Sequence, residues 1–230
     1  MGDDINVNVM IPKSVGHSDY TPQPRQIVEL SHSQAYLAIG DLDFEITWRQ
    51  RLIDASENNK WFDLDEGIAH ESHEGCHHHD PHYWLSPARV EIMIDNLGKA
   101  LKNIEPEASQ RIDSAAAVLK GEVAAYDSTL HTLSGRTFLI YHPALTCLAE
   151  DYAITQLEIE HDGNAPSPQT LERQLKTARE NNVQIVFVQP GYDIEKATDI
   201  AQQIGAKVVN FNPEDEDWPS TINIIIEALK

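Results

Sequence analysis

The chain has 230 residues, of which 41% are hydrophobic, so it is long enough to bury one large core or two modest ones. Its 37 acidic and 17 basic residues give a net charge of -20, which opposes nonspecific binding to nucleic acid and favours the attraction of cations. Because of this charge, we expect no nucleic-acid partner. We also expect no direct membrane insertion, because no apolar run approaches the roughly 20 residues of a membrane-spanning helix.

The first 60 residues predict two strands and a helix. INVNVMIP (5–12) and AYLAIG (35–40) are short runs rich in apolar residues, which favours strands. FEITWRQRLIDASENN (44–59) has a helical pattern. His17 lies in the loop KSVGHSDYTP that follows the first predicted strand.

Residues 67–87 read GIAHESHEGCHHHDPHYWLSP and hold six of the 11 histidines. An internal position and interspersed acidic residues argue against a purification tag, whereas a polar loop without function stays open. Imidazole is the commonest ligand for divalent transition metals, so the tract favours a metal-handling role. His82 differs from the rest, because the apolar residues that follow it can anchor it against a core. The remaining histidines predict a weak auxiliary metal loop: His70, His73, His77, His78 and His79.

Residues 86–134 lack a strand pattern and predict two long helices, with a break at Pro106 and an end at Gly135. A second helix of roughly 28 residues would span about 40 Å, which is the length of a domain rather than of a loop. We therefore expect a stiff connector between two α/β domains. The predicted division is an N-terminal lobe (1–105) that includes the histidine-rich loop (67–82), a linker helix (106–134) and a C-terminal lobe (135–230).

The last hundred residues alternate strand and helix patterns. The expected strands are 137–142, 154–159, 183–190 and 206–211, and the expected helices are 167–182, 194–205 and 217–230. Near-continuous apolar strands that alternate with helices are typical of parallel sheets covered on both faces. The fold class is therefore α/β, with two α/β lobes and mainly parallel sheets.

Several polar side chains follow predicted strands. Ligands of open parallel sheets bind outside the carboxyl ends of the strands, and His17, His142, Gln189 and Asn212 all lie at such ends. Each histidine alone has a simpler explanation as a turn, helix-entry or loop residue. Together with His82, however, three imidazoles from separate elements could hold zinc in a tetrahedral site.

Five phrases of the chain resemble, in order and spacing, the zinc/manganese class of solute-binding proteins of ABC transporters. The resemblance covers essentially the whole chain and rests on GHSDYTPQPRQ, GDLDFEITW, DPHYWLSP, FLIYHPALTCLAEDY and VVNFNPEDEDW. It implies two α/β lobes joined by a long rigid helix, with one metal ion held between the lobes. An acidic, histidine-rich loop before DPHYW is typical of the zinc-binding members.

The resemblance implies that Zn²⁺ is bound by His17 and His82 from the first lobe and by His142 from the second. Asn212 is then either a fourth ligand or a residue that supports the ligands. Manganese-type members have Asp in place of Asn212 and a carboxylate in place of His142. Because imidazole is a softer ligand than carboxylate, this set suits zinc better than manganese.

The implied function is high-affinity capture of Zn²⁺ for import through a membrane ABC permease, by a protein that is periplasmic or anchored at the cell surface and is not an enzyme. A manganese- or iron-binding protein of the same class remains an alternative. A zinc hydrolase also remains open, since three histidines and an open position form catalytic zinc sites, but the chain has no HExxH motif. A role in cell adhesion rests only on descriptions of some relatives.

Members of this class usually begin with an export signal and a strand-helix unit of roughly 30 residues, ahead of the strand that leads to the His17 loop. This chain starts directly with that strand. We therefore expect an N-terminally truncated lobe whose incomplete sheet has an exposed strand edge. Cys76 and Cys147 are too few for a disulfide framework, and whether they pair is left open.

Overall fold

The computed structural model describes residues 5–12, 20–55, 60–68, 81–160 and 166–230. These residues divide into two compact units. The first unit is drawn from Met1–Pro81 and Arg89–Val123, and the second from His82–Ala88 and Ala124–Lys230. The predicted boundaries at 105 and 134 stay predictions, but the segment His82–Ala88 packs with the second unit, whereas the sequence placed it in the first.

The first unit contains a parallel pair of strands, β1 (Ala35–Ala38) and β2 (Lys60–Asp63), with Ala35 opposite Lys60. In chain order, helix α1 (Pro24–Ser31) precedes β1, and helix α2 (Asp43–Asp54) connects β1 to β2. The predicted strand over 5–12 is wrong, since these residues form no strand. Val7 and Val9 are 75% and 68% exposed, so these two side chains are not packed in a core.

Glu45 of α2 is a buried carboxylate that closes the turn after β1. Its side chain accepts hydrogen bonds from the Tyr36 hydroxyl at 2.9 Å, from the Gly40 backbone N–H at 2.8 Å and from the Ile39 N–H at 3.3 Å. Burial raises the pKa of Glu45 above its ordinary value, and these hydrogen bonds offset part of that rise. The turn is therefore built around a group whose charge state depends on pH.

We expect this raised pKa to make stability depend on pH. The folded chain holds the Glu45 proton more tightly than the unfolded chain, so the free energy of unfolding falls as pH rises from about 4.5 through the higher folded pKa. Urea titrations at several pH values between about 4 and 7 should show a steeper fall for the unchanged chain than for Glu45→Gln, which cannot ionise. Equal pH slopes for the two proteins would contradict this assignment.

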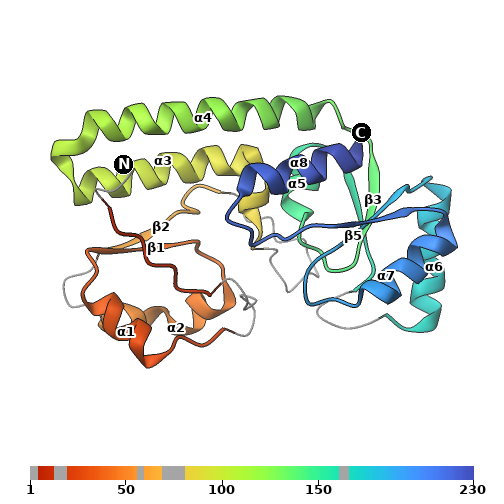
Figure 1. Cartoon of the computed structure of the whole chain (residues 1–230), viewed down its shortest axis with the longest axis horizontal. Helices are drawn as coiled ribbons and strands as arrows, with labels where there is room; N and C mark the ends of the chain where they lie inside the picture. Colours follow the sequence, from red (N-terminus) through yellow and green to blue (C-terminus); the bar gives the residue numbers. More distant parts are fainter. Residues whose placement is uncertain (1–4, 13–19, 56–59, 69–80, 161–165) are drawn as a thin grey trace. The chain divides into compact units, whose positions relative to one another are not determined.

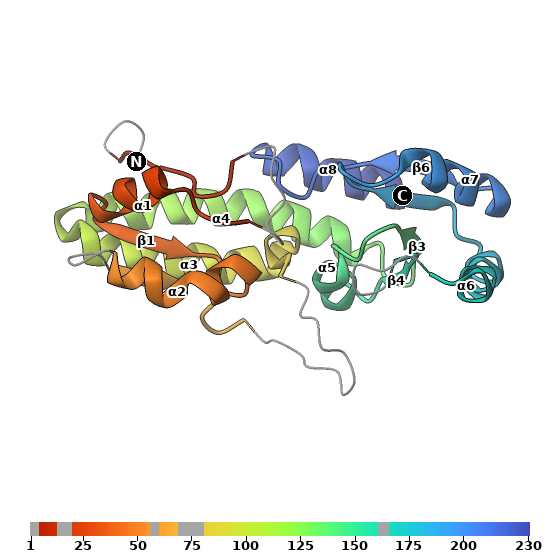
Figure 2. The same cartoon turned by 90° about the horizontal axis from the view of Figure 1, so that it is seen from below.

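The two long helices predicted between 86 and 134 are confirmed. They are α3 (Pro87–Ile104) and α4 (Ser109–His131), separated by the short 3-10 turn η3 (Pro106–Ala108). They run side by side and antiparallel (Figure 1 and Figure 2), with an ion pair between Lys102 and Asp113 and another from Lys120 to Asp95 at 2.9 Å. The division between the two compact units falls within α4, after Val123.

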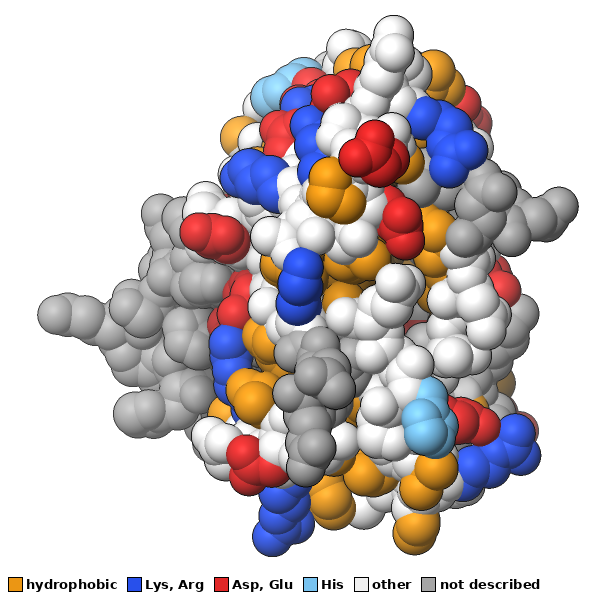
Figure 3. Space-filling model, turned by 90° about the vertical axis from the view of Figure 1, so that its left-hand side faces the viewer, with side chains coloured by type: hydrophobic (Ala, Val, Ile, Leu, Met, Phe, Trp, Pro, Cys, Tyr) orange, Lys and Arg blue, Asp and Glu red, His pale blue; other side chains and the backbone are white. Residues whose placement is uncertain are grey.

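The charged side chains of the face seen in Figure 3 are mixed in sign, and hydrophobic side chains lie among them. Interspersed charges of both signs favour solubility, and they weaken the attraction of a charged partner to this face. In the described part of the chain, no helix is both long enough and apolar enough to cross a membrane.

The second unit contains a four-stranded, wholly parallel sheet in the order β4-β3-β5-β6. Its strands are β3 (Thr137–Ile140), β4 (Thr155–Glu158), β5 (Ile185–Val188) and β6 (Lys207–Asn210). Its helices are α5 (Thr146–Asp151), α6 (Pro168–Glu180), α7 (Ile194–Ile204) and α8 (Trp218–Leu229). All four strands expected here, and the α/β class, are confirmed.

Alternate residues of the strands enter two separate cores, one on each face of the sheet. Phe138 and Phe187 pack on the face covered by α5 and α8, while Leu139 and Val186 pack on the face covered by α6 and α7 (Figure 1). Because both faces are covered, the interior strands β3 and β5 are largely buried and apolar, and their sequence pattern was easy to recognise. The edge strands β4 and β6 also contain polar residues.

Candidate metal site

The polar residues of the second unit gather at the carboxyl ends of its parallel strands. His142 follows β3, Glu160 follows β4, Gln189 follows β5 and Asn212 follows β6. The chain passes from β3 to β4 on one side and later to β5 on the other, so the strand order reverses between β3 and β5. Open α/β sheets bind ligands at this switch point, which is where His142 and Gln189 lie.

The backbone around His142 is fixed by its neighbours. Gln189, which is only 4% exposed, donates a hydrogen bond from Nε2 to the backbone oxygen of His142 at 2.7 Å. On the other side, the Glu160 N–H donates to the Tyr141 oxygen at 2.9 Å, which continues the β3–β4 pairing beyond the ends of the strands. The start of the loop after β3 is therefore held to both adjacent strands.

The imidazole of His142 contacts one acidic and one aromatic side chain. Its Nδ1 lies 3.5 Å from Oε1 of Glu160, whose side chain is 9% exposed. Its ring stacks on that of Tyr192, with the two planes 15° apart and the centroids 5.2 Å apart. Burial, and then the negative charge of Glu160, raise the pKa of the Tyr192 hydroxyl to about 12. The environment of this imidazole is therefore apolar on one face and negative at one edge.

His82 is buried beside His142. It is 3% exposed, and the centroids of the two imidazole rings are 6.1 Å apart, with their planes at 76°. Its ring also contacts Trp84, with a centroid separation of 5.1 Å. Two histidines from distant parts of the sequence therefore lie together in one compact unit.

The segment after His82 explains this pairing. It forms the 3-10 turn η2 (Tyr83–Leu85), in which Trp84 donates from Nε1 to the Pro213 oxygen at 2.7 Å. In return, Trp218 donates from Nε1 to the Trp84 oxygen at 2.5 Å. Leu85 fills the same core as α8. Hydrogen bonds and burial thus fix the turn that carries His82 to the C-terminal unit.

Asn212 uses its side chain within its own turn. Its Oδ1 accepts a hydrogen bond from the Glu214 backbone N–H at 3.1 Å, and its backbone oxygen accepts one from the Thr221 hydroxyl at 3.4 Å. These bonds order the loop before α8. They favour a supporting role, and the direct ligand role of Asn212 stays a prediction.

The other predicted metal residues lie outside the described residues. This applies to His17 and to the whole auxiliary set, which is His70, His73, His77, His78 and His79. Cys76, for which only a pairing with Cys147 was left open, also lies outside the described residues. Among the residues that are described, no three His, Cys, Asp or Glu side chains meet in an arrangement that could hold a metal ion. The ligand roles of His17, His82 and His142 therefore remain predictions, and so does the question of whether Cys76 pairs with the buried Cys147.

Glu160 is the residue near His142 that sequence reasoning missed. It directly follows the predicted strand 154–159, so the rule that selected His142 and Asn212 would have selected it as well.

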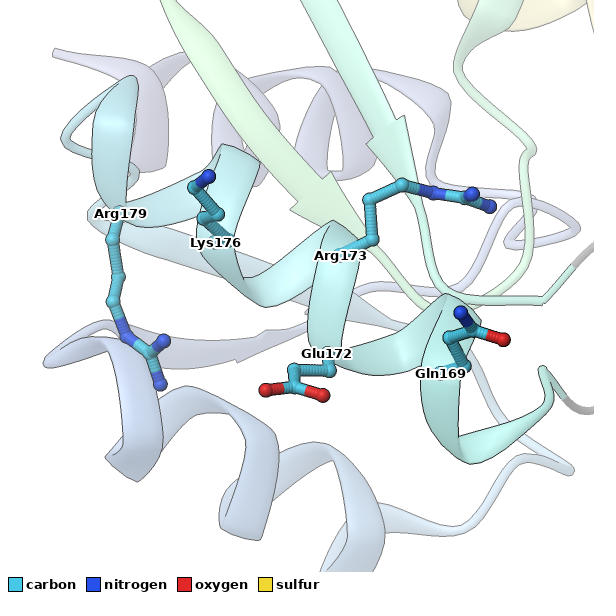
Figure 4. Close-up of a pocket in the computed structure, with 5 residues that line it drawn as sticks. All are labelled: Gln169, Glu172, Arg173, Lys176 and Arg179. Atoms are coloured by element: carbon cyan, nitrogen blue, oxygen red, sulfur yellow. The ribbon is translucent and has the colours of Figure 1, made fainter.

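A hollow along α6 is a poor candidate for a second site. Its lining side chains all come from this one helix and do not converge on a common point, since Arg173 and Arg179 extend in different directions (Figure 4). Arg179 also donates two hydrogen bonds to the Gln203 backbone oxygen, both at 3.2 Å. It therefore has a structural contact across to the end of α7.

Known proteins resemble this chain over its whole length. The family described as zinc-uptake complex component A, periplasmic (ZnuA) matches residues 1–229. A crystal structure of ZnuA is 32% identical, with a TM-score of 0.89 over 100% of this chain and 92% of that one. A ZnuA deletion mutant with zinc bound is also 32% identical, with a TM-score of 0.87 over 98% and 88% of the two chains.

Curated relatives extend further than the matched region. The high-affinity zinc uptake system protein ZnuA of Bacillus subtilis is 26% identical over 90% of this chain and 71% of its own length. The zinc-binding lipoprotein AdcA of Streptococcus pneumoniae is 23% identical over the whole chain, which spans 52% of that protein, or about half.

Proposed function

The chain belongs to the ZnuA family of periplasmic zinc-uptake components, and from this premise we propose that it captures Zn²⁺ outside the cytoplasmic membrane and delivers it to an ABC permease. The proposed ligands are His17, His82 and His142, with Asn212 as a fourth ligand or a support for the others. The observation that carries the proposal is the buried pair formed by His82 and His142 at the switch point of the sheet.

The spacing of these two rings is close to that of a shared ion. With Zn–N bonds of about 2.0 Å, two imidazoles at a tetrahedral angle have ring centroids roughly 5 Å apart. The observed centroid separation is 6.1 Å, so a shift of about one ångström would bring both rings onto one ion. A third imidazole from the His17 loop would leave one position for Asn212 or water.

Ligand chemistry favours zinc over the harder cations. Imidazole suits Zn²⁺, whereas carboxylate, carbonyl and water oxygens suit Mn²⁺. A neutral Asn212 and an imidazole at His142 supply no carboxylate at the two positions where manganese-type members have one. The manganese or iron alternative therefore predicts a different metal preference, which is directly measurable.

Competition between metals tests the proposal. Protein purified without a nickel column is analysed for its metal content, stripped with a chelator and titrated with Zn²⁺ and Mn²⁺ in the presence of a chromophoric competitor. We expect one tight equivalent of zinc and much weaker manganese binding. Tighter binding of Mn²⁺ than of Zn²⁺, or the lack of a tight site, would sink the proposal.

The auxiliary histidine loop should contribute weak binding only. Deleting residues 70–79 should remove additional weak equivalents of zinc and leave the affinity of the tight site within about threefold, since short histidine-rich tracts bind metal without a fixed ligand geometry. Isothermal titration of both forms measures the two classes of site. A variant of unchanged length, with the five histidines replaced by serine, separates the loss of ligands from the shortening of the loop. If either variant lost the tight equivalent, the loop would belong to the main site.

A further inference from the structure

We propose that Glu160 is a positioning residue. Its carboxylate accepts a hydrogen bond from the protonated Nδ1 of His142, and this contact presents Nε2 of the ring to the zinc ion. The inference rests on the proposed ligand role of His142. It assigns a task to a carboxylate that the sequence motifs of the site do not include.

The contact geometry defines which nitrogen faces the acid. Nδ1 of His142 lies 3.5 Å from Oε1 of Glu160, and an ionised carboxylate only accepts hydrogen bonds. An imidazole in this contact therefore carries its proton on Nδ1 and its lone pair on Nε2. The distance exceeds the 2.7–3.2 Å of a formed bond, and we expect it to shorten when Nε2 binds a cation, because metal-bound imidazole is a stronger donor.

The backbone holds Glu160 in this place independently of its side chain. The Glu160 N–H donates to the Tyr141 oxygen at 2.9 Å, and the Ile159 N–H donates to the Ile140 oxygen at 2.9 Å. These bonds continue the β3–β4 register, in which Ile140 is opposite Glu158, so that Glu160 comes opposite His142. With a side chain that is 9% exposed, it has little freedom to turn toward solvent.

Tyr192 restricts the remaining motion of the ring. Its aromatic plane lies 15° from that of His142 at a centroid separation of 5.2 Å, so rotation of the imidazole would break the stack. The carboxylate therefore selects the edge of the imidazole that faces outward, and the tyrosine fixes its plane.

Charge gives Glu160 a second effect on affinity. Zinc bound by three neutral imidazoles keeps both of its positive charges. The carboxylate of Glu160, which is nearly buried and contacts the ligand His142, offsets one of these charges. Partners of this kind typically change metal affinity by 10- to 100-fold. Zinc binding should therefore depend on Glu160 even though the carboxylate does not touch the ion.

Substitution of Glu160 tests the assignment. Glu160→Gln keeps an acceptor for Nδ1–H but removes the charge, and Glu160→Ala removes both. Chelator competition should show a roughly 10-fold weaker zinc affinity for the first and up to about 100-fold for the second. The matched control is Glu172→Gln, which removes the same charge from an exposed position on α6 and should change affinity less than about twofold.

A second measurement distinguishes positioning from a general structural role. Long-range ¹H–¹⁵N spectra of the metal-free, unmodified protein should show the proton of His142 on Nδ1, and Glu160→Ala should shift the tautomer toward Nε2–H. The spectrum of the unmodified protein tests the inference without any variant that must fold. A proton on Nε2 in the unmodified protein would overturn the inference, and so would X-ray absorption that finds one oxygen ligand fewer in zinc-loaded Glu160→Gln, because Glu160 would then be a ligand itself.

The two proposals fail separately. If His142→Ala binds zinc like the unmodified protein, the proposed site is wrong and Glu160 has no ligand to position. If His142→Ala loses zinc binding while Glu160→Gln and Glu160→Ala keep full affinity, the proposed site stands and the role of Glu160 is wrong.

Discussion

His142→Ala should weaken zinc binding by on the order of 100- to 1000-fold. Four-ligand zinc sites gain roughly 10–16 kcal/mol in total, so one ligand accounts for about 3 kcal/mol, or roughly a factor of 150. Glu160 and Tyr192 also contact the imidazole of His142, so its loss leaves these two side chains without the group that they hold. The backbone oxygen that accepts the hydrogen bond from Gln189 is kept in this variant. Chelator competition at neutral pH measures the effect.

A second histidine provides the control for this substitution. His131 on α4 has a side chain that is 62% exposed, and it lies 3.8 Å from Asp127. His131→Ala removes the same chemical group from the same unit and should change zinc affinity less than about twofold. His82→Ala should resemble His142→Ala, since the two rings are expected to share the ion. Circular dichroism of the metal-free variants checks that they fold. An affinity of His142→Ala within threefold of the unmodified protein would contradict the site.

The C-terminal half of this architecture follows from the sequence, because its interior strands β3 and β5 are buried on both faces. A run such as IVFV, which forms β5, has no polar position to confuse its assignment, and parallel strands place their carboxyl ends together without further information. His142, Gln189 and Asn212 were therefore placed at one edge of one sheet, as observed. The predicted roles of these residues remain to be measured.

The first unit was harder to predict, because its strands depend on tertiary contacts. KWFD, which forms β2, begins with Lys60, ends with Asp63 and has no β-branched residue. What favours the strand is its pairing with β1, where Trp61 stacks on Tyr36 at a centroid separation of 4.5 Å. Residues 5–12 show the converse, since alternating valines and asparagines form no strand where the valines stay exposed.

The position of His82 depends on contacts that no local pattern encodes. Trp218, which donates a hydrogen bond to the Trp84 oxygen, is 134 residues from Trp84, and Pro213, whose oxygen accepts one from Trp84, is 129 residues away. The apolar residues after His82 indicated an anchor, but only the folded chain identifies the second unit as the core that receives it. The sequence pattern alone does not reveal these contacts, and the predicted division therefore placed His82 in the N-terminal lobe.

Phe187→Ala should lower the free energy of unfolding of the second unit by about 3–5 kcal/mol, which is the usual cost of removing a buried phenylalanine. Phe187 is fully buried in the interior strand β5 and makes edge-to-face contacts with Phe138 at 5.2 Å and with Phe211 at 5.5 Å. The substitution leaves a cavity between three strands of one core, and strands in a hydrogen-bonded sheet cannot collapse to fill it. Urea unfolding of the metal-free protein, followed by circular dichroism, measures the loss.

Two further variants define what this loss means. Phe187→Leu keeps most of the volume and should cost less than half as much, while Ile194→Ala, at a position that is 49% exposed, should cost below about 1 kcal/mol. Zinc at roughly 100 times its dissociation constant should restore about 2.7 kcal/mol to Phe187→Ala, because the ion binds the folded state and the cavity lies on the sheet rather than among the ligands. A loss below 1 kcal/mol for Phe187→Ala would show that β5 does not organise this core. Failure of zinc to restore stability would show instead that packing of β5 is needed to hold Gln189 against His142.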